Sequence, residues 1–138
     1  MTKKPVLFDK TKIYSITSIV LDSNSILLGN GSTLLFDGSR ADGGIAIKDG
    51  KENIYIENLN LKAKYTNKKN GRGINITKSK NVKIYNCHID GQAIDKDGNF
   101  RAWIENNVID GYGSYNGISI LNSEYIVVDN CSIKNIWS

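Results

Sequence analysis

Residues that favour helices are scarce in this chain of 138 residues, which has one Met, one Gln and few Ala. Ile, Asn and Gly are abundant instead, and this balance favours strands and turns over helices. The sequence has no heptad repeat and no apolar run long enough to span a bilayer, so we expect neither a coiled coil nor membrane insertion. The apolar residues after Lys3, Lys4 and Pro5 are too few for a secretion signal.

Charge and histidine content exclude further classes. The net charge is 18 − 14 = +4, an excess too small to argue for nucleic-acid binding. His88 is the only histidine, and we expect it on the surface with no Ser or Cys nucleophile beside it. No Ser-His-Asp set, zinc motif or phosphate loop occurs in the sequence. The length suits one domain with a narrow, continuous core.

What the chain has is a repeated phrase: an aliphatic residue, any residue, Asn, two residues, and another aliphatic residue. The spacings of the repeated Asn are 28, 20 and 24 residues, and periods in the twenties with alternating apolar residues indicate a solenoid. The four copies span residues 53–61, 81–89, 101–109 and 125–133, with their Asn at Asn58, Asn86, Asn106 and Asn130.

A second phrase, Gly-Ile-x-Ile, precedes most copies. It occurs at 44–47, 73–76 and 117–120, with a degenerate form at 91–94. Each repeat then holds three short strands, which predicts a parallel β-helix, right-handed because parallel crossovers are right-handed almost always. A leucine-rich repeat is rejected because its Asn has other offsets and no repeat has room for a helix. We expect about five coils, an irregular lead-in or cap at 1–17 and the β-helix at 18–138, open at its last coil.

The opening segment carries a family resemblance. It reads Tyr14-Ser15-Ile16, Ile19-Val20-Leu21, a stretch from Ser25 to Gly31, and Thr33-Leu34-Leu35, and the coil phrases follow it. This resembles the start of pectate-lyase-like proteins of the pectin lyase fold. The resemblance implies an all-β, single-stranded, right-handed parallel β-helix. It leaves the activity open, because the superfamily includes lyases, hydrolases, phage tailspikes and non-catalytic stalks.

Strand alternation predicts which side chains form the core. The repeated Asn should stack at one bend as a ladder of hydrogen-bonded amides. Cys87 and Cys131 follow this Asn, and with Asn107 between them they should lie two coils apart, at ~9.6 Å, too far for a disulfide. The predicted inward residues are Ile45, Ile47, Ile54, Ile56, Leu61, Ile74, Ile76, Val82, Ile84, Ile89, Ala102, Ile104, Ile109, Ile118, Ile120, Ile126, Val128 and Ile133.

Two outward columns combine aromatic and charged residues. One reads Tyr55, Lys83, Trp103, Val127, and beside it runs Glu57, Tyr85, Glu105, Asp129. Aromatic side chains on a flat exposed face suit sugar stacking or subunit contact, while packing against one another is the alternative. Trp103 is the substrate-binding candidate among them.

A third column supplies the catalytic candidates, because it stacks Lys62, Asp90, Asp110 and Lys134. Two carboxylates ~5 Å apart raise one another's pKa, and this spacing suits a retaining glycosidase. The alternative is that Asp-Gly is an ordinary turn pair, neutralised by the flanking lysines. Asp95 is the next candidate. Its segment, 95–99, lacks the spacing of an EF-hand, so we predict no cofactor and leave only calcium open.

The turns after the third strand predict the substrate site. Residues 62–72 contain five basic residues and no acid, and residues 110–116 carry two tyrosines. Together they would form a notch that suits an anionic glycan, although a merely solvated loop is the alternative. The candidates are Lys62, Lys64, Lys68, Lys69, Arg72, Tyr112 and Tyr115.

Two classes of function follow. The first is a module directed at a bacterial or plant surface polysaccharide, in a phage tail or secreted protein, which binds the polymer or also cleaves it as a lyase or glycoside hydrolase. The second is a non-catalytic segment that spaces or oligomerises. The expected partners are an anionic polysaccharide and other copies in a trimer, or the rest of a longer chain. The expected location is extracellular or on a virion.

Overall fold

The structure, a computed structural model, describes residues 4–36, 42–64, 70–91 and 114–136, and only the backbone of residues 70, 71, 114 and 115. In these residues the chain forms strands and no helix. The strands are β1 (Val6–Leu7), β2 (Ile13–Ile16), β3 (Ile19–Val20), β4 (Ile26–Leu28), β5 (Thr33–Phe36), β6 (Ile45–Lys48), β7 (Glu52–Glu57), β8 (Asn60–Ala63), β9 (Asn70–Thr77), β10 (Lys80–Tyr85), β11 (His88–Asp90), β12 (Ser114–Leu121), β13 (Glu124–Asp129) and β14 (Ser132–Lys134).

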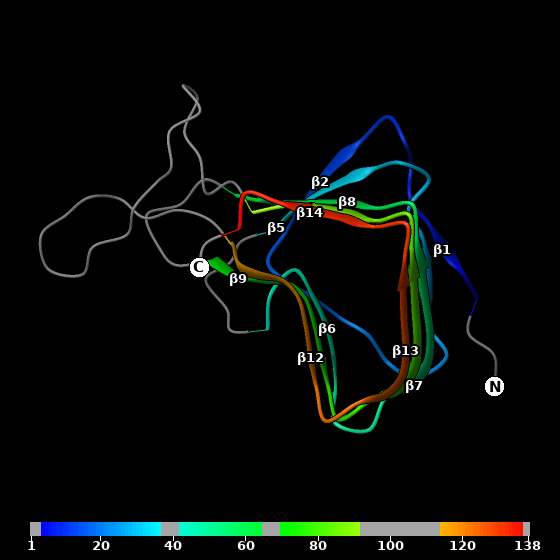
Figure 1. The fold of residues 1–138 in the computed structure, drawn as a ribbon. Helices are drawn as coiled ribbons and strands as arrows, with labels where there is room; N and C mark the ends of the chain where they lie inside the picture. Colours follow the sequence, from blue (N-terminus) through cyan, green and yellow to red (C-terminus); the bar gives the residue numbers. More distant parts are fainter. Residues whose placement is uncertain (1–3, 37–41, 65–69, 92–113, 137–138) are drawn as a thin grey trace, which may run out of the picture.

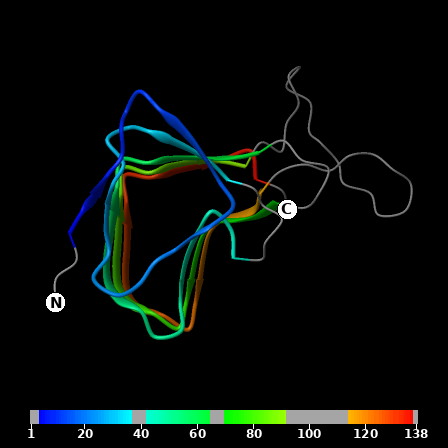
Figure 2. The same cartoon turned by 180° about the vertical axis from the view of Figure 1, so that it is seen from behind.

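Every strand belongs to one of three parallel sheets. Sheet A has the order β1-β4-β7-β10-β13, sheet B the order β2-β5-β8-β11-β14, and sheet C the order β3-β6-β9-β12. The chain visits the three sheets in turn, and each such circuit is called a coil below. Figure 1 looks along the stack and shows the sheets as three sides of a triangle, and Figure 2 shows the same stack from behind. The arrangement is compatible with a parallel β-helix.

The core fills the inside of the triangle, as the alternation of the strands predicts. Side chains at the inward positions of β6 to β11 are almost fully buried, with exposed fractions of 0–2%. These confirmed core residues are Ile45, Ile47, Ile54, Ile56, Leu61, Ile74, Ile76, Val82, Ile84 and Ile89.

Close packing explains the glycine that opens the Gly-Ile-x-Ile phrase. A Cβ on Gly73 would lie 2.6 Å from the carbonyl oxygen of Gly117 and 2.8 Å from Cγ2 of Ile89. Gly44 and Gly117 meet side chains of sheet B in the same way. The phrase therefore marks the point where sheet C passes too close to sheet B for any side chain.

The order of the coils differs from the predicted order. Strand β10 pairs directly with β13, with Val82 beside Ile126 and Ile84 beside Val128. Likewise β11 pairs with β14, and β9 with β12. The prediction that residues 101–109 form a coil between those of Asn86 and Asn130 is therefore wrong, and residues 101–109, including Asn106, lie outside the described residues.

The corrected order also changes the relationship of the two cysteines. Cys87 and Cys131 lie in adjacent coils, where the backbone N–H of Ser132 donates to the carbonyl oxygen of Cys87 at 3.0 Å. The backbone nitrogen of Cys87 is 3.5 Å from Sγ of Cys131. The predicted separation of ~9.6 Å was wrong because it counted a coil between them. Both thiols are free, with Cys87 buried and Cys131 half-buried.

The segment predicted as a lead-in joins the stack. Strand β2, which lies within the predicted lead-in, pairs in parallel with β5. Strands β1 and β3 pair in the same way with β4 and β6. Residues 6–20 thus contribute the first strand of each sheet.

Candidate functional site

In the outward column of sheet B, where two catalytic carboxylates were predicted, the described residues include one, Asp90. Asp90 is the register partner of Lys62 on one side and Lys134 on the other. Its carboxylate accepts a hydrogen bond from Nδ2 of Asn135 at 2.9 Å and lies 3.8 Å from Nζ of Lys134. The predicted direct stacking of Asp90 on Asp110 is wrong, because Lys134 takes that place. Asp110 and Asp95 lie outside the described residues.

The predicted substrate-binding residues are only partly described. Lys62 is exposed on the outer face of sheet B, Lys64 is half-buried just after the end of β8, and Arg72 is half-buried within β9 of sheet C. The remaining candidates, namely Lys68, Lys69, Trp103, Tyr112 and the side chain of Tyr115, lie outside the described residues. The notch between the basic and the tyrosine-bearing segments therefore stays a prediction.

The aromatic residues on the outer face of sheet A pack against one another. The ring centroids of Tyr55 and Tyr85 are 5.6 Å apart, with the rings tilted by 42°. The hydroxyl of Tyr55 donates to Oε2 of Glu57 at 2.8 Å, and this bond, more than burial, raises the pKa of Tyr55. The packing alternative holds for these two rings. Val127 follows Lys83 directly in the column, without Trp103 between them.

The edge where sheet A meets sheet B carries the predicted amide ladder, and is called the A/B corner below. Asn58, Asn86 and Asn130 all have left-handed backbone conformations there, with φ of 52°, 51° and 49°. Asn is among the few residues that tolerate this conformation, and its side chain can bond to the next coil. Nδ2 of Asn130 donates to Oδ1 of Asn86. The predicted amide bond is confirmed between Asn86 and Asn130, and Asn58 shares their backbone conformation.

A shallow hollow of about 450 Å³ runs along the A/B corner. Four of its six lining residues are Asn from consecutive coils, so it offers both hydrogen-bond donors and acceptors. Three of these amides are partly committed. Nδ2 of Asn60 donates to the carbonyl oxygen of Gly31 at 2.9 Å, Nδ2 of Asn30 donates to that of Phe8 at 3.5 Å, and Oδ1 of Asn86 accepts from Asn130. The lining residues are Asn30, Gly31, Asn58, Asn60, Asn86 and His88.

His88 is exposed, as predicted, but the prediction that no Ser lies beside it is wrong. Its Nδ1 lies 2.7 Å from Oγ of Ser132, one coil further along sheet B. The backbone N–H groups of both residues bond to the preceding coil, at Leu59 and Cys87, so neither can stabilise an oxyanion. The pair is therefore a polar contact beside the hollow and lacks the donors of an acyl-transfer site.

A second corner, where sheet C leads into sheet A, was missed by sequence reasoning and is called the C/A corner. Nδ2 of Asn81 donates to Oδ1 of Asn53 at 2.6 Å, and Nδ2 of Asn53 donates to Oδ1 of Asn24 at 3.3 Å. The next position of this second ladder is Tyr125, which also has a left-handed backbone, with φ of 54°. The signal in the sequence was Asn at 24, 53 and 81, at spacings of 29 and 28 residues.

Charges alternate along the C/A corner beside a hollow of about 500 Å³. Lys80 stands between Glu52 and Glu124 in the strand register, with its Nζ 3.1 Å from Oε2 of Glu52. The bond to Glu52 raises the pKa of Lys80, and the charge of Glu124 adds to the effect. Each carboxylate thus faces the ammonium, an arrangement that neutralises charge and does not prepare a general acid.

Metal and membrane sites find no support in the part of the chain that the structure describes. No group of three or more His, Cys, Asp or Glu side chains converges there as metal ligands would. None of its segments is a helix long and apolar enough to cross a bilayer.

Comparison with known proteins adds no assignment: no protein-family model, no curated protein and no solved structure matches the chain. The function must therefore be argued from the corners and faces described above.

Proposed function

We propose that the chain is a polysaccharide-binding module that holds an anionic glycan along the A/B corner and the adjoining face of sheet B. The observation that carries this proposal is the hollow lined by amide side chains from consecutive coils. A linear polymer repeats its hydroxyl groups along its length, and a stack of coils repeats its amides in the same way at about 4.8 Å. Successive amides of the stack could therefore bond to successive sugar units of one polymer.

Positive charge beside the hollow supports an anionic ligand. Lys62 and Lys134 are exposed on the outer face of sheet B, in the column next to Asn60 and His88. Only one acid, Asp90, stands between them in that column. Lysine side chains attract carboxylate or sulfate groups as mobile point charges. The basic residues predicted for the same site, including Lys68 and Lys69, would extend this charge.

Narrower proposals complete this picture. We propose a right-handed β-helix of about five coils, similar to the pectin lyase fold, and a place outside the cell or on a virion, where such glycans occur. If the chain also cleaves its ligand as a lyase or hydrolase, the candidate groups remain Asp90, Asp110 and Asp95. The structure describes only Asp90 of these, paired with Lys134 and Asn135.

Binding is tested by isothermal titration with polygalacturonate as the anionic probe and dextran as the neutral one. We expect polygalacturonate to bind, dextran to bind more weakly, and added salt to weaken the anionic complex. The double variant Lys62→Glu/Lys134→Glu should abolish binding, whereas Lys48→Glu/Lys78→Glu, which makes the same charge change near the C/A corner, should not. Equal affinity for both polymers, or equal losses in both variants, contradicts the proposal.

A second candidate function, a structural module that associates with itself, is favoured by a different observation. Among the described residues, all large apolar side chains that are exposed belong to the first or the last strand of a sheet. None of them belongs to an interior strand of a sheet, so the exposed apolar surface is concentrated on the first and last coils, which are the surfaces suited to association.

A further inference from the structure

The last coil, formed by β12, β13 and β14, exposes residues that belong to the core by position. Val128 continues the inward column of Ile84, and Ile133 continues that of Ile89. Val128 is 41% exposed and Ile133 48%, whereas Ile84 and Ile89 are 0% and 1% exposed. These inward side chains are exposed because no further coil among the described residues covers them. The outer edges of the three strands have no described strand partner either.

The first coil, formed by β1, β2 and β3, presents a matching apolar end. Val6 heads an inward column of sheet A and is 51% exposed, and Tyr14 and Ile19 head inward columns of sheets B and C and are half-buried. The exposed Leu7, Ile13 and Val20 lie in the outward columns beside them. Its strands are also the terminal strands of sheets A, B and C. As far as the described strands go, both ends of the stack therefore offer one edge per sheet without a partner strand, and strand edges of this kind are templates for pairing.

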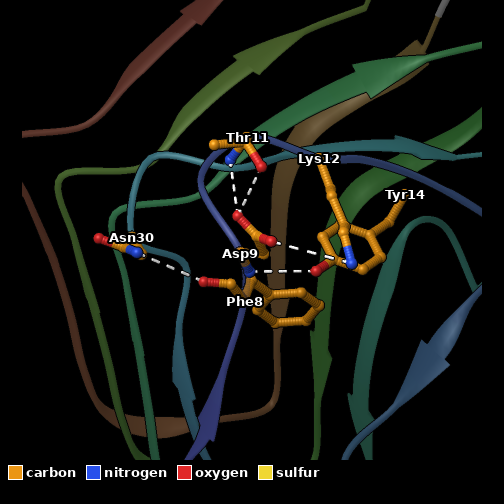
Figure 3. Close-up of polar contacts among 6 residues, drawn as sticks. All are labelled: Phe8, Asp9, Thr11, Lys12, Tyr14 and Asn30. Atoms are coloured by element: carbon orange, nitrogen blue, oxygen red, sulfur yellow. Dashed lines mark hydrogen bonds and ion pairs between the residues drawn. The ribbon is translucent and has the colours of Figure 1, made fainter.

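The first coil is held in shape by its own contacts, which Figure 3 shows. Asp9 accepts hydrogen bonds on Oδ1 from the backbone N–H and the hydroxyl of Thr11, at 2.9 and 2.8 Å. The backbone N–H of Asp9 donates to the hydroxyl of Tyr14 at 3.0 Å, and the ring of Tyr14 packs edge-on against Phe8. This end is thus a defined surface that a partner can recognise without first ordering it.

We propose that copies of this chain stack head to tail, with the last coil of one copy pairing with the first coil of the next. The inward columns of all three sheets then continue with apolar residues in a single register. In sheet A, Val128 meets Val6 of the second copy, because Val6 leads the column of Leu27, Ile56 and Ile84. By the same register, Ile133 meets Tyr14 in sheet B, and Ile118 meets Ile19 in sheet C.

Charge favours this pairing over one between two identical ends. Residues 4–20 contain three Lys and one Asp, a net charge of 3 − 1 = +2. Residues 114–134 contain one Lys, one Asp and one Glu, a net charge of 1 − 2 = −1. Opposite ends attract and like ends repel, so complementarity selects the head-to-tail order.

Head-to-tail contact is heterologous, and it produces open filaments when no rotation closes it. The inference deepens the second proposed function, on which it rests, and is independent of glycan binding. It also replaces the expected closed trimer with a series of species whose size grows with concentration.

The test uses one variant for each end, Val6→Lys and Val128→Lys, examined by sedimentation velocity alone and as an equimolar mixture. Both side chains are about half exposed, so a lysine can extend into solvent without entering the core. We expect the unmodified chain to form a growing series of species and each variant alone to stay monomeric. The mixture should form a one-to-one dimer, because each variant keeps the end that the other has lost.

A matched control is Leu121→Lys, which adds the same charge to the last coil but on its outward side, in the column of Lys48 and Thr77. It should associate like the unmodified chain. Ile19→Lys and Ile133→Lys, both in inward columns, serve as second variants if either first variant loses its far-ultraviolet circular dichroism signal.

Each contrary outcome has a distinct meaning. Homodimers of Val6→Lys would show that identical last coils pair, which overturns the head-to-tail order. Association that survives in both variants would place the contact on the sides, overturning the inference but leaving a self-associating module. A strictly monomeric unmodified chain would overturn the inference and the second proposed function together.

Discussion

The side-chain amide of Asn130 donates a hydrogen bond directly to the side-chain carbonyl of Asn86, although 44 residues separate them. This bond connects two adjacent coils at the A/B corner, and the strand registers of β10 with β13 and of β11 with β14 agree with it. The coil that ends at Asp90 is therefore followed in the stack by the coil that contains Asn130. Several consequences of this arrangement can be measured.

The ladder predicts two separable losses at Asn86. Asn86→Gly removes the amide but keeps a residue that tolerates a left-handed backbone, so it should lower the free energy of unfolding by about 1 kcal/mol. Asn86→Ala should cost about 1 kcal/mol more, because its Cβ is strained at a φ of 51°. Thermal and urea unfolding measure both values. Asn106→Gly is the comparison, and a loss as large as that of Asn86→Gly would contradict the observed pairing.

At Tyr125, unlike at Asn86, a substitution should raise the free energy of unfolding. It occupies the ladder position held by Asn53 and Asn81 in earlier coils, is 78% exposed and has a φ of 54°. Tyr125→Asn should raise the free energy of unfolding by about 1 kcal/mol, because Asn tolerates this backbone better. Tyr125→Ala also removes the ring, but Ala tolerates a left-handed backbone less well than Asn, so its free energy of unfolding should rise less. A larger gain for Ala than for Asn would refute this explanation.

The glycine column makes a third prediction. Gly73→Ala should lower stability by about 2–3 kcal/mol, because the new methyl group meets backbone and a core side chain at under 3 Å. Gly50→Ala is the control for backbone strain alone, since its φ is 82° and its Cβ would meet nothing within 4 Å. Urea unfolding should show a clearly smaller loss for the control. Equal losses would mean that sheet C is not crowded at Gly73.

The two thiols should differ in reactivity. Burial raises the pKa of Cys87 to about 11, and only the thiolate reacts with alkylating agents. Near pH 8, iodoacetamide should modify Cys131 well before Cys87, which peptide mass spectrometry resolves. The pKa of the Cys87 thiol is higher in the folded chain than in the unfolded one. The contribution of this buried neutral thiol to the free energy of unfolding is therefore complete below the ordinary thiol pKa and is lost as the pH rises through about 11. Faster modification of Cys87 would show that it is not in the core.

The repeated phrases predicted strand positions, core residues and the phase of the amide ladder, because these depend on local alternation. Ile54, Ile84 and Ile89 are buried where the pattern placed them. The phrases could not predict the order of the coils, because each copy presents the same apolar pattern to any coil edge. That ambiguity put Asp110 next to Asp90 and hid the contact between His88 and Ser132.

The second ladder, at the C/A corner, was not predicted from the sequence for a different reason. Its members, Asn53 and Asn81, stand within strands, where Asn is usually read as an outward polar residue. The column also ends in Tyr125, which breaks the sequence signal although the backbone keeps the same left-handed turn. The left-handed backbone at this bend therefore follows from the stacking of the coils and could not be predicted from the residue types.

The direct stacking of residues 124–134 on residues 80–90 is tested most directly by proton–proton contacts in nuclear magnetic resonance spectra of the isotope-labelled chain. The structure predicts contacts across β11 and β14, from Ile89 to Ile133, and across β10 and β13, from Val82 to Ile126. Contacts that join residues 80–90 to 101–109, and 101–109 in turn to 124–133, would contradict the account.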